Sequence, residues 1–191
     1  MIKKIYTYIQ KIRTGFMIIT IPCILFAFNI SEGEDNKRLL IGIDLFPSFL
    51  ASDQDIASKT GSDNQLHIVL IYQYNKQIAE NMAKRLENLG KIRGIPIKVM
   101  VLSVSEIDFF NNQTIAGIFI VESLVPLASI IKKSIDNHFI VFSPFEGDVE
   151  KGVTGGIYIT ERILPYINNE TLRLANIEMK SFFLKVSKKY E

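Results

Sequence analysis

Apolar runs alternate with amphipathic segments between residues 66 and 143, and this alternation constrains the fold more than any other feature. Four runs rich in β-branched residues predict buried strands: LHIVLIYQY (66–74), IPIKVMVLS (95–103), IAGIFIVE (115–122) and FIVFS (139–143). The segments 75–90 and 126–137 repeat apolar residues at helical spacing, and residues 105–110 suit a short helix. Strands that alternate with helices favour right-handed crossovers and a mostly parallel sheet. We therefore predict an α/β fold.

The pattern changes after residue 145. GGIYIT and ILPYIN predict a strand hairpin around Glu161 and Arg162, and NETLRLANI predicts a short helix with an asparagine cap. The last segment, EMKSFFLKVSKKY, predicts a second short helix that buries Phe182, Phe183 and Val186. We place residues 34–191 in a single α/β domain.

Gly155 and Gly156 raise the question of a phosphate-binding loop, because glycine lets backbone N–H groups approach phosphate closely. Such a loop lies between a strand and the start of a helix, whereas these glycines lead into a strand. The interpretation is therefore structural: a turn with a close backbone approach, and no bound cofactor.

The N-terminal segment differs in composition from the rest. Four basic residues precede the uncharged apolar run 15–30, and acidic residues follow it. This layout predicts that residues 1–33 are a secretory signal or an uncleaved membrane anchor, with membrane contact only through residues 15–30. Either reading exports the domain. Cys23, the only cysteine, lies in this run, so the exported domain has no thiol chemistry.

Residues that carry enzyme chemistry are few. His67 and His138 are far apart and lack metal-ligand spacing, so we expect no metal site and interpret both as strand-edge histidines. Ser123 lacks the flanking glycines of a nucleophile elbow. Asp44 and Glu122 suit a carboxylate pair, but we interpret them as capping or solvated residues. We predict no catalytic residue and no enzyme activity.

Two further observations concern binding. The net charge of +2 is concentrated in the N-terminal segment, so the near-neutral domain gives no reason to expect a nucleic-acid partner. LVPL (124–127) follows the third strand, where open α/β sheets bind ligands, so a small-molecule cleft is geometrically permitted there.

The stretches LHIVLIYQYN, GIPIKVMVLS and AGIFIVES, followed by GGIYI, PYINNETLRLANI and MKSFFLKVSKKY, resemble the YfiR-like family of periplasmic proteins. The segment IGIDLFPSFLA (41–51) lies where that family has its leading helix. The resemblance implies a core like half of a periplasmic solute-binding protein. In that family the leading helix commonly ends in a Trp-Pro pair, and several members have disulfides. This chain departs from both features, because it has no tryptophan and its domain has no cysteine.

The resemblance also implies a function. Members act as non-enzymatic periplasmic regulators that bind and inhibit the periplasmic part of a membrane signalling protein, a diguanylate cyclase or a sensor kinase. It allows a homodimer as well. Two alternatives stay open: a periplasmic ligand-binding sensor that resembles a solute-binding protein, and a hydrolase with an unrecognised site.

A regulator of that kind needs apolar anchors on its surface. The motif DLFPSFL offers Phe46, Phe49 and Leu50 as the partner-binding candidates. The alternative for the same three residues is that they fill the core.

Overall fold

The computed structural model describes residues 33–110, 114–123 and 125–191, so the predicted signal or anchor, including Cys23, lies outside the described residues apart from Gly33. Residues 33–52 form a helix, called the leading helix below, and residues 38–191 form one compact unit. Within the described residues, no helix is both long enough and apolar enough to cross a membrane.

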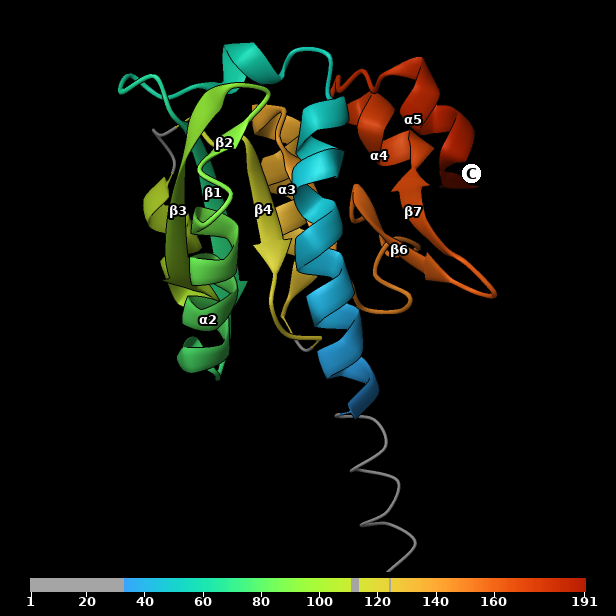
Figure 1. The fold of residues 1–191 in the computed structure, drawn as a ribbon, viewed down its shortest axis with the longest axis horizontal. Coiled ribbons are helices and arrows are strands. Elements are labelled where there is room, and N and C mark those ends of the chain that lie inside the picture. The colour runs from blue at the N-terminus through green and yellow to red at the C-terminus, as the bar shows by residue number, and fades with distance from the viewer. Residues whose placement is uncertain (1–32, 111–113, 124) are drawn as a thin grey trace, which may run out of the picture. The chain divides into compact units, whose positions relative to one another are not determined.

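One mostly parallel sheet organises the described chain (Figure 1). Its strands run in the order β2-β3-β1-β4-β5-β6-β7-β8. Their bounds are β1 Leu66–Tyr72, β2 Lys91–Ile92, β3 Ile95–Ser103, β4 Gly117–Ile120, β5 Ile140–Ser143, β6 Gly155–Ile159, β7 Ile163–Asn168 and β8 Lys188–Tyr190. The neighbours from β3 to β6 pair in parallel, whereas β2 pairs antiparallel with β3, and β7 pairs antiparallel with β6.

Short helices connect these strands. They are α2 Lys76–Glu87, α3 Leu127–Asn137, α4 Asn169–Leu174 and α5 Ser181–Val186, with 3-10 turns η1 Ile56–Lys59 and η2 Val104–Phe110. Local signals fix their ends. The Asn75 side chain accepts a hydrogen bond from the Ile78 N–H at the start of α2, and Asn168 accepts one from Thr171 at the start of α4. Gly90, at φ +71°, ends the α2 segment in the left-handed region.

The strand order separates the helices onto two faces of the sheet. The chain moves from β1 outward to β3 through α2, but from β4 in the opposite direction to β5 through α3, so right-handed crossovers place α2 and α3 on opposite faces. The leading helix lies on the α2 face, where Asp44 pairs with Arg85 of α2 (Figure 1).

Beneath the leading helix lies an aromatic core. Phe46 contacts Phe119 and Phe142 with ring centroids 5.4 and 5.5 Å apart, and Phe49 packs edge-on against Phe142 and Phe183. Glycine makes this packing possible, because a Cβ on Gly155 would lie 2.0 Å from Cζ of Phe49. The glycine pair is therefore structural, and the close approach predicted from the sequence is the reason.

The predicted hairpin of β6 and β7 and the two short C-terminal helices are confirmed. The expected burial in the last segment is wrong in part. Phe183 is buried, but Phe182 and Val186 are 63% and 55% exposed. The helix ends at Val186 because the chain then extends as β8 beside β7, so only one side of this six-residue helix meets the core.

Candidate ligand pocket

A cavity of about 300 Å³ opens at the carboxyl ends of β4 and β5. Parallel strands direct their following loops to the same edge of the sheet, and these loops form binding sites in open α/β folds. Here the loop after β4 leads into α3, and the loop 144–154 after β5 leads into β6. The lining residues come from these two connections and from α3: Ser123, Val125, Leu127, Ala128, Ile131, Asp148 and Lys151.

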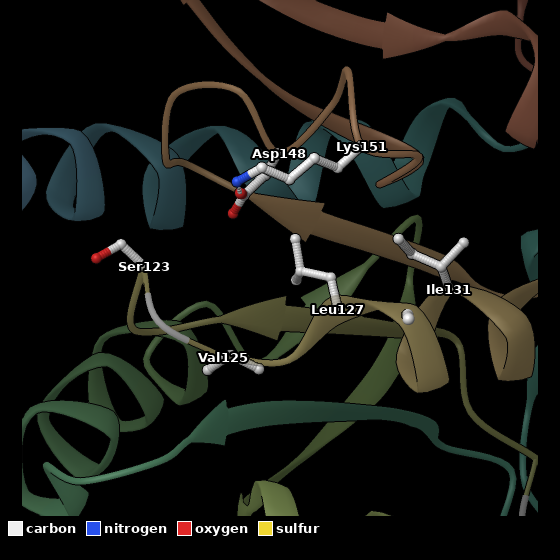
Figure 2. A pocket seen from close by; sticks show the side chains of 7 residues that line it. Ser123, Val125, Leu127, Ile131, Asp148 and Lys151 are labelled. Carbon is white, nitrogen blue, oxygen red and sulfur yellow. Dashed lines mark hydrogen bonds and ion pairs between the residues drawn. The ribbon is translucent and has the colours of Figure 1, made fainter.

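The first two turns of α3 supply the apolar wall. Leu127, Ala128 and Ile131 share one side of the helix because residues three and four apart are neighbours on a helix surface. Leu127 and Ile131 are half-buried and Ala128 is exposed, so apolar surface here still faces solvent. In Figure 2 the Leu127 side chain points toward the charged residues across the cavity.

The opposite wall carries an ion pair. Nζ of Lys151 donates to Oδ1 of Asp148 at 3.0 Å, and the buried Ser143 hydroxyl donates to Oδ2 at 2.6 Å. The Asp148 side chain is 2% exposed, whereas that of Lys151 is 63% exposed. The buried carboxylate therefore holds the ammonium end of a lysine whose side chain is otherwise largely exposed, and Figure 2 shows the two side chains together on one side of the cavity.

The loop that carries this pair is itself fixed. Gly147 and Gly152 adopt φ values of +80° and +107°, which glycine tolerates better than other residues. From the α4 side, the Asn168 amide donates to the Val149 carbonyl at 2.8 Å, and the Thr171 hydroxyl donates to the Gly152 carbonyl at 2.9 Å. Two side-chain hydrogen bonds thus tie the loop that carries the lysine to the start of α4.

Of the predicted polar residues, only Ser123 reaches the pocket, where its side chain is exposed. Asp44 and Glu122 have different partners. Asp44 accepts two hydrogen bonds of 2.7 Å from Arg85, and Glu122 accepts backbone N–H groups of Tyr74 and Asn75. The two carboxylates therefore do not form a pair. Glu122 binds backbone N–H groups, as expected of a capping residue, whereas Asp44 is exposed but forms an ion pair with Arg85.

The histidines serve local structure. Nε2 of His67 lies 2.9 Å from Oδ1 of Asp63, and this hydrogen bond lowers the pKa of the Asp63 carboxyl to about 2. His138 ends α3 at φ +61°, with Nδ1 2.9 Å from the Ala175 carbonyl oxygen. Within the described ranges, no group of three histidine, cysteine, aspartate or glutamate residues is arranged to hold a metal ion.

The partner-binding candidates Phe46, Phe49 and Leu50 are all fully buried. Their assignment as surface anchors is wrong for this fold, because a side chain without exposed surface cannot contact a partner. Within the motif DLFPSFL, Phe46, Phe49 and Leu50 form the core-facing side of the leading helix, which is the alternative that the sequence left open.

The sequence permitted a cleft after the third strand but did not identify the residues that line it. The helical spacing of 126–137 predicts only that Leu127 and Ile131 lie on one face of a helix, and nothing in the sequence distinguishes Asp148 and Lys151 from other charged residues in a loop. The only available signal was position, since both segments directly follow predicted parallel strands.

No family model matches this chain, and no curated protein matches it. Several solved structures are similar in fold, among them the following two. The ligand-free, open structure of a substrate-binding protein with adhesive properties from Clostridium difficile has a TM-score of 0.51 and 14% identity, with 78% of this chain and 58% of that chain covered. An ABC domain in complex with L-Trp from Streptococcus pneumonia has a TM-score of 0.49 and 12% identity, with 73% and 59% covered.

These likenesses concern the fold. This chain spans less than two thirds of each of the two proteins. The predicted fold class, an α/β domain that resembles part of a solute-binding protein, is confirmed. The resemblance to the YfiR-like family, the export of the domain and its signalling partner stay predictions.

Proposed function

We propose that this chain is a ligand-binding sensor domain that takes a small molecule into the pocket between α3 and the loop 144–154. The observation that carries the proposal is the combination of an open apolar wall with a lysine held in place by a buried carboxylate. Small-molecule sites typically combine an apolar lining with a few fixed polar groups.

The fold supports the same proposal. The Clostridium difficile neighbour is described as a substrate-binding protein, and the pocket here lies at the carboxyl edge of the sheet, where α/β folds bind ligands. The alternative, a regulator that binds a partner protein, has less support, because its proposed contact residues Phe46, Phe49 and Leu50 are buried in the core. The pocket is therefore the better basis for a function.

Filling the pocket tests the proposal. Ala128 is an exposed residue that lines the cavity, and Ser129 is an exposed neighbour on α3 that does not line it. Ala128→Phe should occupy the cavity, whereas Ser129→Phe places the same side chain outside it. Both positions are exposed, so we expect stability changes within about 0.5 kcal/mol.

The measurement is isothermal titration calorimetry of the full chain with a library of small apolar acids, amines and neutral compounds. We expect at least one compound to bind saturably to the parent and to Ser129→Phe but not to Ala128→Phe. Absence of saturable binding by every class, or equal binding to both variants, would contradict a ligand function for this pocket.

A further inference from the structure

We infer that the ligand is a small apolar carboxylate whose anionic group binds Nζ of Lys151. This inference rests on the proposed function and specifies the chemical class of the ligand. Three observations support it: the charges of Lys151 and Asp148, the apolar nature of most other lining residues, and the volume of the cavity.

Lys151 presents a positive charge that is only partly used. An ammonium group has three N–H donors, and one of them bonds to Asp148 at 3.0 Å. The side chain is 63% exposed, so the other donors can reach a ligand. A carboxylate is the complementary acceptor, because hydrogen bonds between ionised partners are stronger than those between neutral groups.

Asp148 does not offer an equivalent site for a cation. Its side chain is 2% exposed, and its two oxygens already accept hydrogen bonds from Lys151 and Ser143. A ligand ammonium group would have to displace one of these bonds and reach a buried oxygen. The pocket therefore discriminates in favour of anions, although the Asp148–Lys151 pair as a whole is neutral.

The remaining lining residues favour a ligand whose uncharged part is apolar. Beyond the ion pair, Ser123 contributes the remaining polar side chain among the lining residues, and the others are Val125, Leu127, Ala128 and Ile131. In Figure 2, Lys151 and Leu127 face each other across the cavity, with Ser123 and Ile131 toward opposite ends. A volume of about 300 Å³ lies at the lower end of the range for small-molecule sites, which suits a single ring or a short alkyl chain.

Matched acids and amides isolate the contribution of charge. We would titrate the full chain with phenylacetate and phenylacetamide, and with hexanoate and hexanamide, because each pair differs chiefly in charge. We expect each acid to bind about fivefold to tenfold more tightly than its amide at low salt, which is the range of one partly exposed charge-assisted contact. The preference should shrink as the salt concentration rises.

Variants of Lys151 assign the preference to its ammonium group. Lys151→Gln should remove the difference between acid and amide, and Lys151→Arg should retain most of it. Lys84→Gln, which removes an exposed lysine of α2 away from the pocket, should leave the difference unchanged. Thermal melts of each variant show whether it is folded, and Lys151→Arg retains a charge that can bond to Asp148 if Lys151→Gln disturbs the loop.

The outcomes separate the two proposals. If an acid and its amide bind equally, or if Lys151→Gln keeps the preference, the ligand class is wrong while the pocket function stands. If only amines or neutral compounds bind and Ala128→Phe abolishes their binding, the ligand class again fails alone. If Ala128→Phe leaves all binding intact, the pocket itself is the wrong site.

Discussion

The two faces of the sheet use similar apolar residues with opposite results. On the face of the leading helix, Phe46, Phe49 and Leu50 have no exposed surface. On the other face, Leu127 and Ile131 of α3 remain half-exposed beside a cavity of about 300 Å³. We call the side with the filled core under the leading helix the sealed face. We call the side of α3, where the cavity remains, the hollow face.

The two helices differ in how completely they pack because different side chains and loops face them. Gly117 and Gly155 have no side chain on the face of the leading helix, and the Phe49 ring fills the space that a Cβ of Gly155 would need. The first turns of α3 instead face a loop that carries an ion pair, with the small side chain of Ala128 among them. Complementary packing serves stability on the first face, and incomplete packing leaves room for a ligand on the second.

The largest expected effect comes from the sealed face. Phe49→Ala should lower the free energy of unfolding by about 3–5 kcal/mol, because it leaves a cavity in a fully buried aromatic cluster. Gly155→Ala alone should also destabilise, since its Cβ would lie 2.0 Å from Cζ of Phe49. Together the two changes should cost less than their sum, with a coupling of about 0.5–3 kcal/mol.

Urea denaturation of the two single variants and the double variant measures this coupling, provided that the m-values stay equal. Strictly additive losses would mean that Gly155 and Phe49 do not share the space that the structure assigns to them. The sealed character of this face would then need another explanation.

A smaller effect is expected at Gly156, which connects the two regions. A Cβ there would lie 2.5 Å from the Ser143 carbonyl oxygen and 2.8 Å from Cγ2 of Val149. The backbone carbonyl of Ser143 cannot move aside as easily as a flexible side chain. Gly156→Ala should therefore lower the free energy of unfolding by about 1–3 kcal/mol. Because Ser143 also positions Asp148, the variant should weaken ligand binding as well.

The control is Ser129→Ala, because Ser129 is an exposed residue of α3 that does not line the cavity. Chemical denaturation and calorimetry of both variants provide the comparison. If Gly156→Ala is as stable as the control, the close approach of β6 to β5 is not a constraint on this fold.

On the hollow face, a substitution should affect ligand binding more than stability. Ile131→Ala removes a half-buried side chain and should cost only about 1 kcal/mol of stability, from the apolar area that it no longer buries. The same change should weaken ligand binding, whereas Phe49→Ala should mainly reduce stability. A loss at Ile131 as large as that at Phe49 would show that Ile131 belongs to the core, and the contrast between the faces would disappear.

The smallest effect concerns an exposed charge away from both apolar regions. The His67 hydrogen bond lowers the pKa of Asp63 from 3.8 to about 2, so the ionised carboxylate favours the folded state. This contribution is present above pH 3.8 and is lost as the pH falls through about 2. Asp63→Asn should flatten the stability profile over that interval and leave ligand affinity near neutral pH unchanged. Equal slopes for the variant and the parent would refute this assignment.

The sequence predicted β1, β3, β4 and β5, a mostly parallel sheet and the C-terminal hairpin, because each depends on local apolar patterns and turn residues. It missed the short strands β2 and β8. It did not distinguish the two faces, since Phe49 and Ile131 are both apolar residues at helical spacing. Their burial depends on partners distant in the chain, such as Gly155 for the phenylalanine and the loop of Lys151 for the isoleucine. The exposure of Phe182 and Val186 escaped prediction for the same reason, because β8 shortens the last helix.

The most direct test of the pocket is a methyl NMR titration of the full chain with phenylacetate. The account predicts saturable chemical-shift changes at the methyl groups of Val125, Leu127, Ala128 and Ile131. The methyl groups of the sealed face, such as those of Leu50, should shift little. Saturable changes confined to the leading helix, or no saturable change at the pocket with phenylacetate or with any other compound that binds the chain in calorimetry, would contradict the claim that the hollow face is the ligand site.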